Sequence, residues 1–381
     1  MDTSSEINRF PAETRDWWIK FKGIVGSPQI PALDGLRAIS IFLVIFYHFG
    51  FERVNGAMGV EVFFVLSGFL ITWLLIKESD KTGDVSLLGF YKRRALRIFP
   101  AFYVFLFFGL AIILVRHSDG TVPWAHIASA FFYVSNYYHA LNRPDDSYVT
   151  ATWSLSIEEQ FYLLWPFLFS FFKNRLETMT KILLGIIGLV WIHRAMLHLG
   201  FGIHPTYLYH AFDTRADELM VGCLLAVLIK RETYVPLWRA LCRQSYYPLI
   251  TIILLAVSSM FHYNPTYRFV FGYAIEPILI AALIVQLIYF SDTFSWRFIE
   301  WPWVKYLGRI SYSLYLYQAI TLFTARRLTQ DRPVLVQLVF AIGITVLFAS
   351  ASYFIIEKPF LKLRDKKLSS LLFWRAPEAS L

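Results

Sequence analysis

Long apolar runs constrain the fold of this chain more than any other feature of its sequence. An α-helix needs about 20 predominantly apolar residues to cross a bilayer, and ten stretches of roughly that length alternate here with polar segments. They lie at roughly 35–51, 58–76, 98–115, 154–172, 181–199, 214–229, 246–262, 269–290, 307–325 and 333–356. Charged residues make up only 17% of the 381 residues, against roughly 25% in soluble domains. The predicted fold class is therefore all-α, a polytopic membrane bundle of about ten helices.

One further apolar segment, 124–140, leaves two readings open. It is interrupted by the polar side chains His126, Ser135, Asn136 and His139. Such a segment fits an interfacial or re-entrant helix, or an eleventh span. We expect one membrane domain over 34–360, between a cytoplasmic N-terminal segment at 1–33 and a cytoplasmic C-terminal tail at 361–381.

Basic residues predict the orientation of the spans. Lysines and arginines concentrate in the N-terminal segment, in the loop after the second span and in the C-terminal tail. With ten spans these segments share one side, and short loops rich in Lys and Arg stay in the cytoplasm. One loop disagrees, because it places Arg326, Arg327 and Arg332 outside. The net charge of +9 suits cytoplasmic loops and anionic membrane lipids, and we expect no nucleic-acid partner.

Two ionisable side chains lie within the first span. Arg37 and His48 are 11 positions apart, a step that returns to within about 20° of the same helix face and rises roughly 16 Å. Charged or titratable groups in a bilayer are costly, so they are candidates for function. The alternative is an arginine that reaches the membrane surface and a histidine that only packs.

Two adjacent carboxylates, Glu158 and Glu159, lie at the outer start of the fourth span. Adjacent helix residues diverge by about 100°, so at most one of the two faces a given pocket. Ser154, Glu158 and Tyr162 share one face. If Glu158 meets His48 across the bundle, its carboxylate would stabilise the imidazolium of a general base. The alternative is a favourable interaction of both carboxylates with the helix dipole.

A basic segment, Tyr91 to Pro100, leads into the third span. Arg94 and Arg97 lie three residues apart and can present planar guanidinium groups to one polyanion. Coenzyme A, with a diphosphate and a ribose phosphate, is such a polyanion. The alternative is anchoring of the loop in the cytoplasm. In the second span, the Ser67-Gly68 pair permits close approach of a backbone or ligand.

Taken together, these segments resemble the membrane-bound acyltransferase family 3. The stretches LDGLRA, FVLSGFLIT, RRALRIFP, WSLSIEEQFYLLWP, FDTRADEL, LGRISYSLYL and IEKPF follow that family's order from about residue 30 to 365. The resemblance implies a ten-helix acyl-CoA-dependent O-acyltransferase that modifies a carbohydrate, with acyl-CoA as co-substrate and no permanently bound cofactor or metal.

The resemblance also suggests roles for individual residues. It implies that His48 is the catalytic histidine, with Glu158 and Glu159 as the acidic pair. We assign donor binding to Arg37, Tyr91, Arg93, Arg94 and Arg97. We assign acceptor binding to Trp153, Ser154, Tyr162, His210, Asp213 and Arg215. The chain departs from the family at Gln318, where a histidine is common.

We therefore predict transfer of an acyl group, most simply acetyl, from acyl-CoA to a hydroxyl of a surface polysaccharide or lipopolysaccharide sugar such as O-antigen. The protein would lie in a bacterial inner membrane. Because the chain stops soon after the last span, without the fused esterase-like domain of some members, we expect direct acylation of a glycan or lipid-linked glycan. Two alternatives stay open: acylation of a cytoplasmic small molecule or lipid intermediate, and a transporter or flippase whose buried charges line a path.

Overall fold

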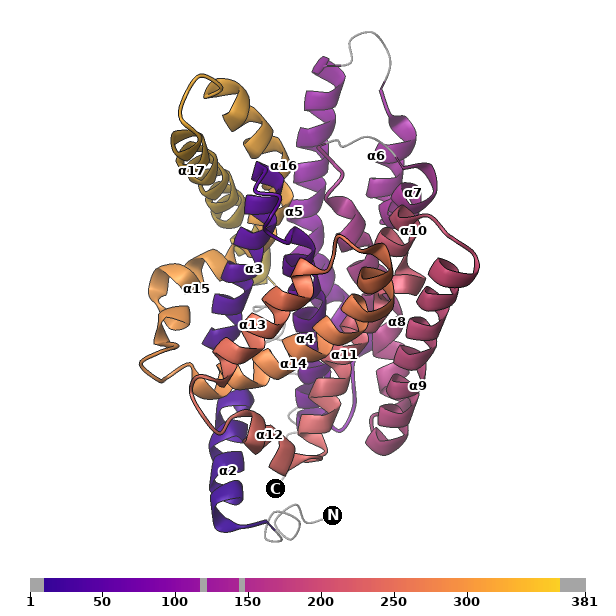
Figure 1. The fold of residues 1–381 in the computed structure, drawn as a ribbon, viewed down its shortest axis with the longest axis vertical. Helices are drawn as coiled ribbons and strands as arrows, with labels where there is room; N and C mark the ends of the chain where they lie inside the picture. The colour runs from indigo at the N-terminus through magenta and orange to yellow at the C-terminus, as the bar shows by residue number, and fades with distance from the viewer. Residues whose placement is uncertain (1–9, 117–121, 144–147, 364–381) are drawn as a thin grey trace, which may run out of the picture.

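Helices account for all of the regular structure in the part of the chain that is described. The computed structural model describes residues 10–116, 122–143 and 148–363, and no strand occurs among them. Most long helices run along the long axis of the molecule, while α13 and α14 cross it obliquely (Figure 1). α2 (Ala12–Gly26) lies at the lower end of the view. The predicted all-α membrane fold is confirmed.

Each expected span corresponds to a helix. These helices are α3 (Pro31–Phe49), α4 (Gly56–Thr82), α5 (Leu87–Arg116), α8 (Thr152–Phe172), α9 (Leu176–Ala195), α11 (Phe212–Lys230), α13 (Tyr247–Met260), α14 (Tyr273–Phe290), α16 (Ser311–Leu328) and α17 (Val334–Ser352). Within the described residues, 6 helical segments are long and apolar enough to cross a membrane. The figure of about ten spans stays a prediction.

Short helices join the long ones. They are α6 (Trp124–Phe131), α7 (Ser135–Asn142), α10 (Pro205–His210), α12 (Val235–Leu241) and α15 (Pro302–Arg309), with the π-helices η1 (Met196–Gly200), η2 (Tyr267–Gly272) and η4 (Tyr353–Glu357) and the 3₁₀-helix η3 (Arg297–Glu300). The segment 124–140 therefore forms two helices of 8 residues each. A helix of that length rises only about 12 Å against a hydrocarbon core of about 30 Å, so neither helix is an eleventh span.

The ends of α3 and α4 are fixed by their own sequence. Pro31 begins α3, where its missing N–H is not needed. Gly50 ends α3 with a φ of 101°, a conformation that favours glycine. Asn55 then caps α4, because its side-chain oxygen accepts a hydrogen bond from the Met58 N–H at 3.2 Å. The turn between α3 and α4 is thus well defined directly after His48.

Glycines bring the central helices into backbone contact. A methyl group at Gly68 in α4 would overlap the carbonyl oxygen of Leu219 in α11, and one at Gly222 would overlap the carbonyl oxygen of Val65. A methyl group at Gly308 in α15 would overlap the carbonyl oxygen of Asp34. Small residues allow this close approach of helices in membranes. The predicted role of Gly68 in close packing is confirmed, and the approaching group is the backbone of α11.

Candidate functional site

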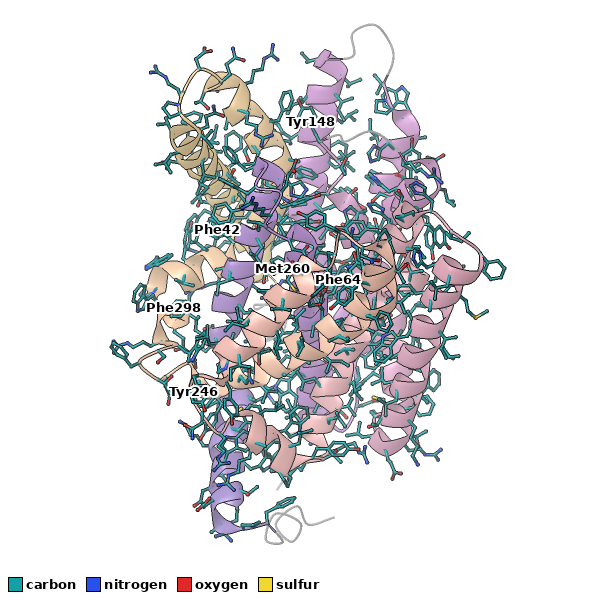
Figure 2. The ribbon with its side chains drawn as sticks, in the orientation of Figure 1. Phe42, Phe64, Tyr148, Tyr246, Met260 and Phe298 are labelled. Carbon is teal, nitrogen blue, oxygen red and sulfur yellow. The ribbon has the colours of Figure 1, made fainter. Side chains whose placement is uncertain are left out.

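A large cavity lies beside α3. Its volume is about 1920 Å³, and α3, α4, α13, α14 and α16 all contribute to its wall. Figure 2 labels two of the residues that line it, Met260 near the middle of the molecule and Tyr148 toward the upper end. From α3 the lining includes Leu36, Leu43 and His48. The cavity therefore extends along most of this helix, from an apolar end to a polar one.

His48 lies in the wall of this cavity, near the C-terminus of α3. Its Nδ1 is 2.8 Å from the carbonyl oxygen of Val44, one turn earlier. A carbonyl can only accept, so Nδ1 carries the proton and the neutral ring has its lone pair on Nε2. This is the tautomer that a general base needs when it takes a proton through Nε2.

His210 lines the same cavity and is held in the same way. Its Nδ1 donates to the carbonyl oxygen of Thr206 at 2.8 Å. The ring packs between Trp153, whose centroid is 4.9 Å away, and His139 at 5.3 Å. Burial lowers the pKa of His210 to about 4, so this imidazole is neutral near pH 7. The structure brings the predicted residues His48, Trp153 and His210 to one cavity.

Glu158 does not reach His48. Among the described residues its carboxylate accepts hydrogen bonds from Ser67 at 2.8 Å and from Tyr162 at 3.4 Å. The expected contact between Glu158 and the imidazole is therefore replaced by a contact with α4. Ser154, Glu158 and Tyr162 lie four residues apart within the single helix α8, and the Tyr162 hydroxyl reaches Glu158. Ser154 meets Tyr315, a residue of the cavity lining, at 2.6 Å.

Glu159, the second carboxylate of the pair, points elsewhere. It interacts electrostatically with Tyr103 and Tyr133 on the side of α5 and with Arg94. Its Oε1 is buried and has no hydrogen-bond partner among the described residues. The two acids thus lie on different faces of α8, as adjacent positions of a helix require, although the charge of Arg94 acts on both.

The predicted donor residues gather below the cavity. Arg94 stacks over the Tyr162 ring at 4.7 Å, and the charges of Arg94 and Arg37 both act on Glu158. Arg37 lies 3.9 Å from Asp34, which Arg97 also influences. Arg37, Arg94 and Arg97 therefore form one cationic group around Glu158 and Asp34. None of these arginines belongs to the described lining of the cavity.

Tyr91 and Arg93 are the outer members of the predicted donor group. The Tyr91 hydroxyl donates to the carbonyl oxygen of Leu163 at 2.8 Å, which fastens α5 to α8. Arg93 forms an ion pair with Glu78 at 2.5 Å. Both contacts hold the start of α5 in place beside Arg94.

Asp213 and Arg215, which we expected to bind the acceptor, are not among the described residues that line the cavity. Asp213 accepts hydrogen bonds from Tyr137 at 3.0 Å and from His193 at 2.9 Å. Arg215 is fully buried, pairs with Glu218 at 2.5 Å and stacks on Tyr273 at 4.0 Å. Their binding roles stay predictions, and the contacts seen here support the wall.

The structure adds polar groups that the sequence reasoning did not single out. Glu61 and Glu276 are both fully buried and interact electrostatically. Glu276 accepts from the Nε2–H of His262 at 2.8 Å, and His262 lines the cavity. The sequence did contain a signal for Glu61 and Glu276, because acidic residues inside membrane spans are rare and are usually functional or paired. Arg268 and Arg326 also line the cavity.

Comparison with known proteins decides the family. The profile of an acyltransferase domain, acyltransferase family 3, matches residues 30–354. The chain belongs to this acyltransferase family. It is also 33% identical over 357 residues to the peptidoglycan O-acetyltransferase OatA of Listeria monocytogenes, covering 87% of this chain and 56% of that protein. No solved structure matches the chain.

Other relatives of this chain carry related names. A Staphylococcus aureus protein named for an inferred O-acetyltransferase activity is 32% identical to this chain over 363 residues. The match covers 91% of this chain and 59% of the Staphylococcus protein. A Bacillus subtilis protein named for an inferred peptidoglycan O-acetyltransferase activity is 33% identical to this chain over 350 residues. The match covers 87% of this chain and 54% of the Bacillus protein. The chain thus spans less than three fifths of the length of these curated relatives.

The residues of this chain that carry the family resemblance divide into two kinds in the structure. Gly35, Gly68 and Gly308 allow close contact between helix backbones. His48 and Trp153 instead line the cavity. These stretches of the chain therefore include residues that assemble the bundle as well as residues that line the cavity.

Proposed function

We propose that this protein transfers an acetyl group from acyl-CoA to a hydroxyl of a bacterial cell-envelope polysaccharide. The observation that carries the proposal is His48, a histidine with its Nε2 lone pair set by a backbone contact, in the wall of a cavity large enough for a sugar. The name of the Listeria relative favours a peptidoglycan-type acceptor over the lipopolysaccharide sugar of our first prediction. Membership of an acyltransferase family supports the reaction class.

In the proposed reaction, His48 acts as general base. Its Nε2 takes the proton of the acceptor hydroxyl as the hydroxyl oxygen attacks the thioester carbonyl of acyl-CoA. An ester C–O bond forms and the C–S bond breaks. The imidazolium returns the proton to the leaving sulfur, which gives CoA-SH and neutral His48. Atoms and charge balance without a metal or redox partner.

The cationic group below the cavity is proposed as the donor site. Arg37, Arg94 and Arg97 would bind the phosphates of acyl-CoA, since guanidinium groups match phosphate oxygens. The polar face of α8 connects this group to the cavity wall, through Tyr162, Glu158 and Ser154. The pantetheine arm would follow that face over roughly the 16 Å between Arg37 and His48. Glu158 then serves by holding the arginines and Ser67 in position.

The test uses three matched histidine variants of the purified protein in lipid nanodiscs. His48→Asn keeps a donor for the Val44 carbonyl but has no base, so kcat should fall by about 10²–10⁴-fold. His210→Asn keeps the contact with Thr206 and should raise KM for the glycan more than it lowers kcat. His198→Asn is the control, because His198 is not part of the described cavity lining and bonds Thr266, which does not line the cavity either.

Two products are measured with acetyl-CoA and a peptidoglycan-type oligosaccharide, the CoA thiol and the acetylated sugar. Wild-type turnover with equal amounts of both supports acetyl transfer. A wild-type rate retained in His48→Asn removes this histidine from the mechanism. Absence of CoA release in every acceptor tested would instead favour a transport function.

A further inference from the structure

Positive charge dominates the polar part of the cavity. Among the described residues its charged lining consists of Arg53, Arg268, Arg326 and a single acid, Glu52, together with the histidines His48, His126, His210 and His262. A cavity lined by one sign of charge raises the local concentration of ligands of the opposite sign. A neutral sugar would not require this arrangement.

Arg268 is the most rigidly held of these arginines. It lies on the π-helix η2, a type of segment that is frequent at functional sites. Its Nε donates to the Tyr273 hydroxyl at 2.8 Å, and its guanidinium lies over the Tyr209 ring at 4.8 Å. No described carboxylate lies within ion-pair distance of Arg268. With Nε occupied, the terminal nitrogens remain as donors for a ligand.

The neighbouring arginines make the contrast clear. Arg215 stacks on the same Tyr273 ring at 4.0 Å but is paired with Glu218. Arg194, also fully buried, is paired with Asp217 at 3.0 Å. Carboxylates therefore neutralise Arg194 and Arg215 inside this wall, whereas no described carboxylate pairs with Arg268, which lines the cavity.

Arg326 supplies a second cation from a different helix. Its guanidinium lies over the Phe49 ring at 5.0 Å, and a side chain at Gly50 would come within 2.7 Å of its terminal nitrogen. It thus lies against the C-terminus of α3, two residues after His48. No described carboxylate pairs with it. Arg326, in the last turn of α16, is one of the outer basic residues that break the basic-residue pattern, and a place in the cavity gives a reason for that exception.

We propose that Arg268 and Arg326 bind an oxyanion of the acceptor, so that the preferred acceptor is an anionic glycan bearing a carboxylate or a phosphate. This inference rests on the proposed function, because it assigns the cavity to the acceptor. The donor phosphates are assigned to Arg37, Arg94 and Arg97, which do not line the cavity. Arg268 and Arg326 then position the glycan so that one hydroxyl meets His48.

The experiment compares three trisaccharides of equal length: N-acetylglucosamine trimer, the same trimer ending in muramic acid with its carboxylate, and the trimer carrying a phosphate monoester. Wild-type protein should show a kcat/KM about tenfold or more higher for an anionic trisaccharide, as expected for one charge-assisted contact. The carboxylate and phosphate arms identify which oxyanion is preferred. Acetyl-CoA is kept saturating throughout.

Substitutions then test whether Arg268 and Arg326 cause the preference for an anionic acceptor. Arg268→Gln and Arg326→Gln should each lower kcat/KM for the anionic trisaccharides by at least tenfold more than for the neutral trimer. Arg268→Lys should retain part of the preference, since it keeps the charge but loses the planar fork. Arg327→Gln is the matched control, because Arg327 neighbours Arg326 and does not line this cavity.

Several outcomes would overturn the inference. One is a wild-type protein without preference for an anion. Another is an Arg268→Gln variant that unfolds at the wild-type temperature but loses kcat/KM equally on neutral and anionic sugars. That result would mean that Arg268 only supports the cavity wall. A raised KM for acetyl-CoA in Arg268→Gln or Arg326→Gln would assign these arginines to the donor instead of the acceptor. Calorimetry with the muramic-acid trisaccharide, in the absence of acetyl-CoA, separates the two proposals. Binding that depends on Arg268, in a protein that transfers no acetyl group, would refute the proposed function and leave the anion site standing.

Discussion

At the scale of single residues, three histidines link the stability of the protein to pH. His126 and His139 share one hydrogen bond, Nε2 to Nε2 at 2.9 Å, and His139 stacks on His210. Burial lowers the pKa of His126 and His210 to about 4 and that of His139 to about 3, from an ordinary 6.5. Between these values the unfolded chain binds protons that the folded chain does not. Stability should therefore fall as pH drops below about 6.5.

The measurement is the unfolding temperature of the purified protein in detergent at pH 7 and pH 5. We expect a lower temperature at pH 5, and a smaller difference in His139→Gln, which removes one of the buried imidazoles. The exposed His204 offers a control, since His204→Gln should keep the wild-type difference. An unchanged pH dependence in His139→Gln would show that other groups set it.

The sequence predicted only part of the site at this scale. His48 and Arg37 stood out because any ionisable group in an apolar run does, and the helix period placed them on one face. Glu158 was correctly placed on a face with Ser154 and Tyr162, yet its neighbour across the bundle, Ser67, depends on which helices touch. Arg268 was missed, since what sets it apart is that no described carboxylate pairs with it, a property that only tertiary contacts define.

At the scale of elements, the contact between α4 and α11 should tolerate no added carbon. Gly68→Ala and Gly222→Ala each force a methyl group onto a backbone carbonyl of the facing helix. Overpacking of this kind typically costs about 1–3 kcal/mol. Gly185→Ala in α9 is the control, because nothing lies within 4 Å of the added carbon there. Thermal unfolding in detergent should rank both α4–α11 variants below wild type, and equal stability of all variants would refute the tight contact.

Apolar runs predicted elements well but not their interruptions. A run reports that residues avoid water, so each of the ten expected spans matches a helix. The predicted span 307–325 is instead divided at Ile310 between α15 and α16, and 269–290 begins within the π-helix η2. Such breaks depend on local backbone contacts, as at Tyr133, whose φ of 54° separates α6 from α7. Hydropathy does not predict these helix breaks.

At the scale of the whole molecule, the proposed reaction depends on sidedness, because donor and acceptor would enter from opposite faces. The loop between α8 and α9 lies at the lower end with α2, whereas the loop between α16 and α17 lies at the upper end (Figure 1). Asn174 and Gln330 are exposed in these two loops. The basic segments predict that the lower end is cytoplasmic.

Single cysteines can test this orientation, because the two native ones, Cys223 and Cys242, are buried and can be replaced by serine or alanine. Gln330→Cys should react with an impermeant thiol reagent added to intact spheroplasts. Asn174→Cys should react only after the membrane is permeabilised. The reverse pattern would put the polar end of the cavity, with His48 and Arg326, on the cytoplasmic side. Surface-glycan acetylation would then be refuted, while acyl-CoA-dependent transfer to a cytoplasmic acceptor would remain compatible with the same site.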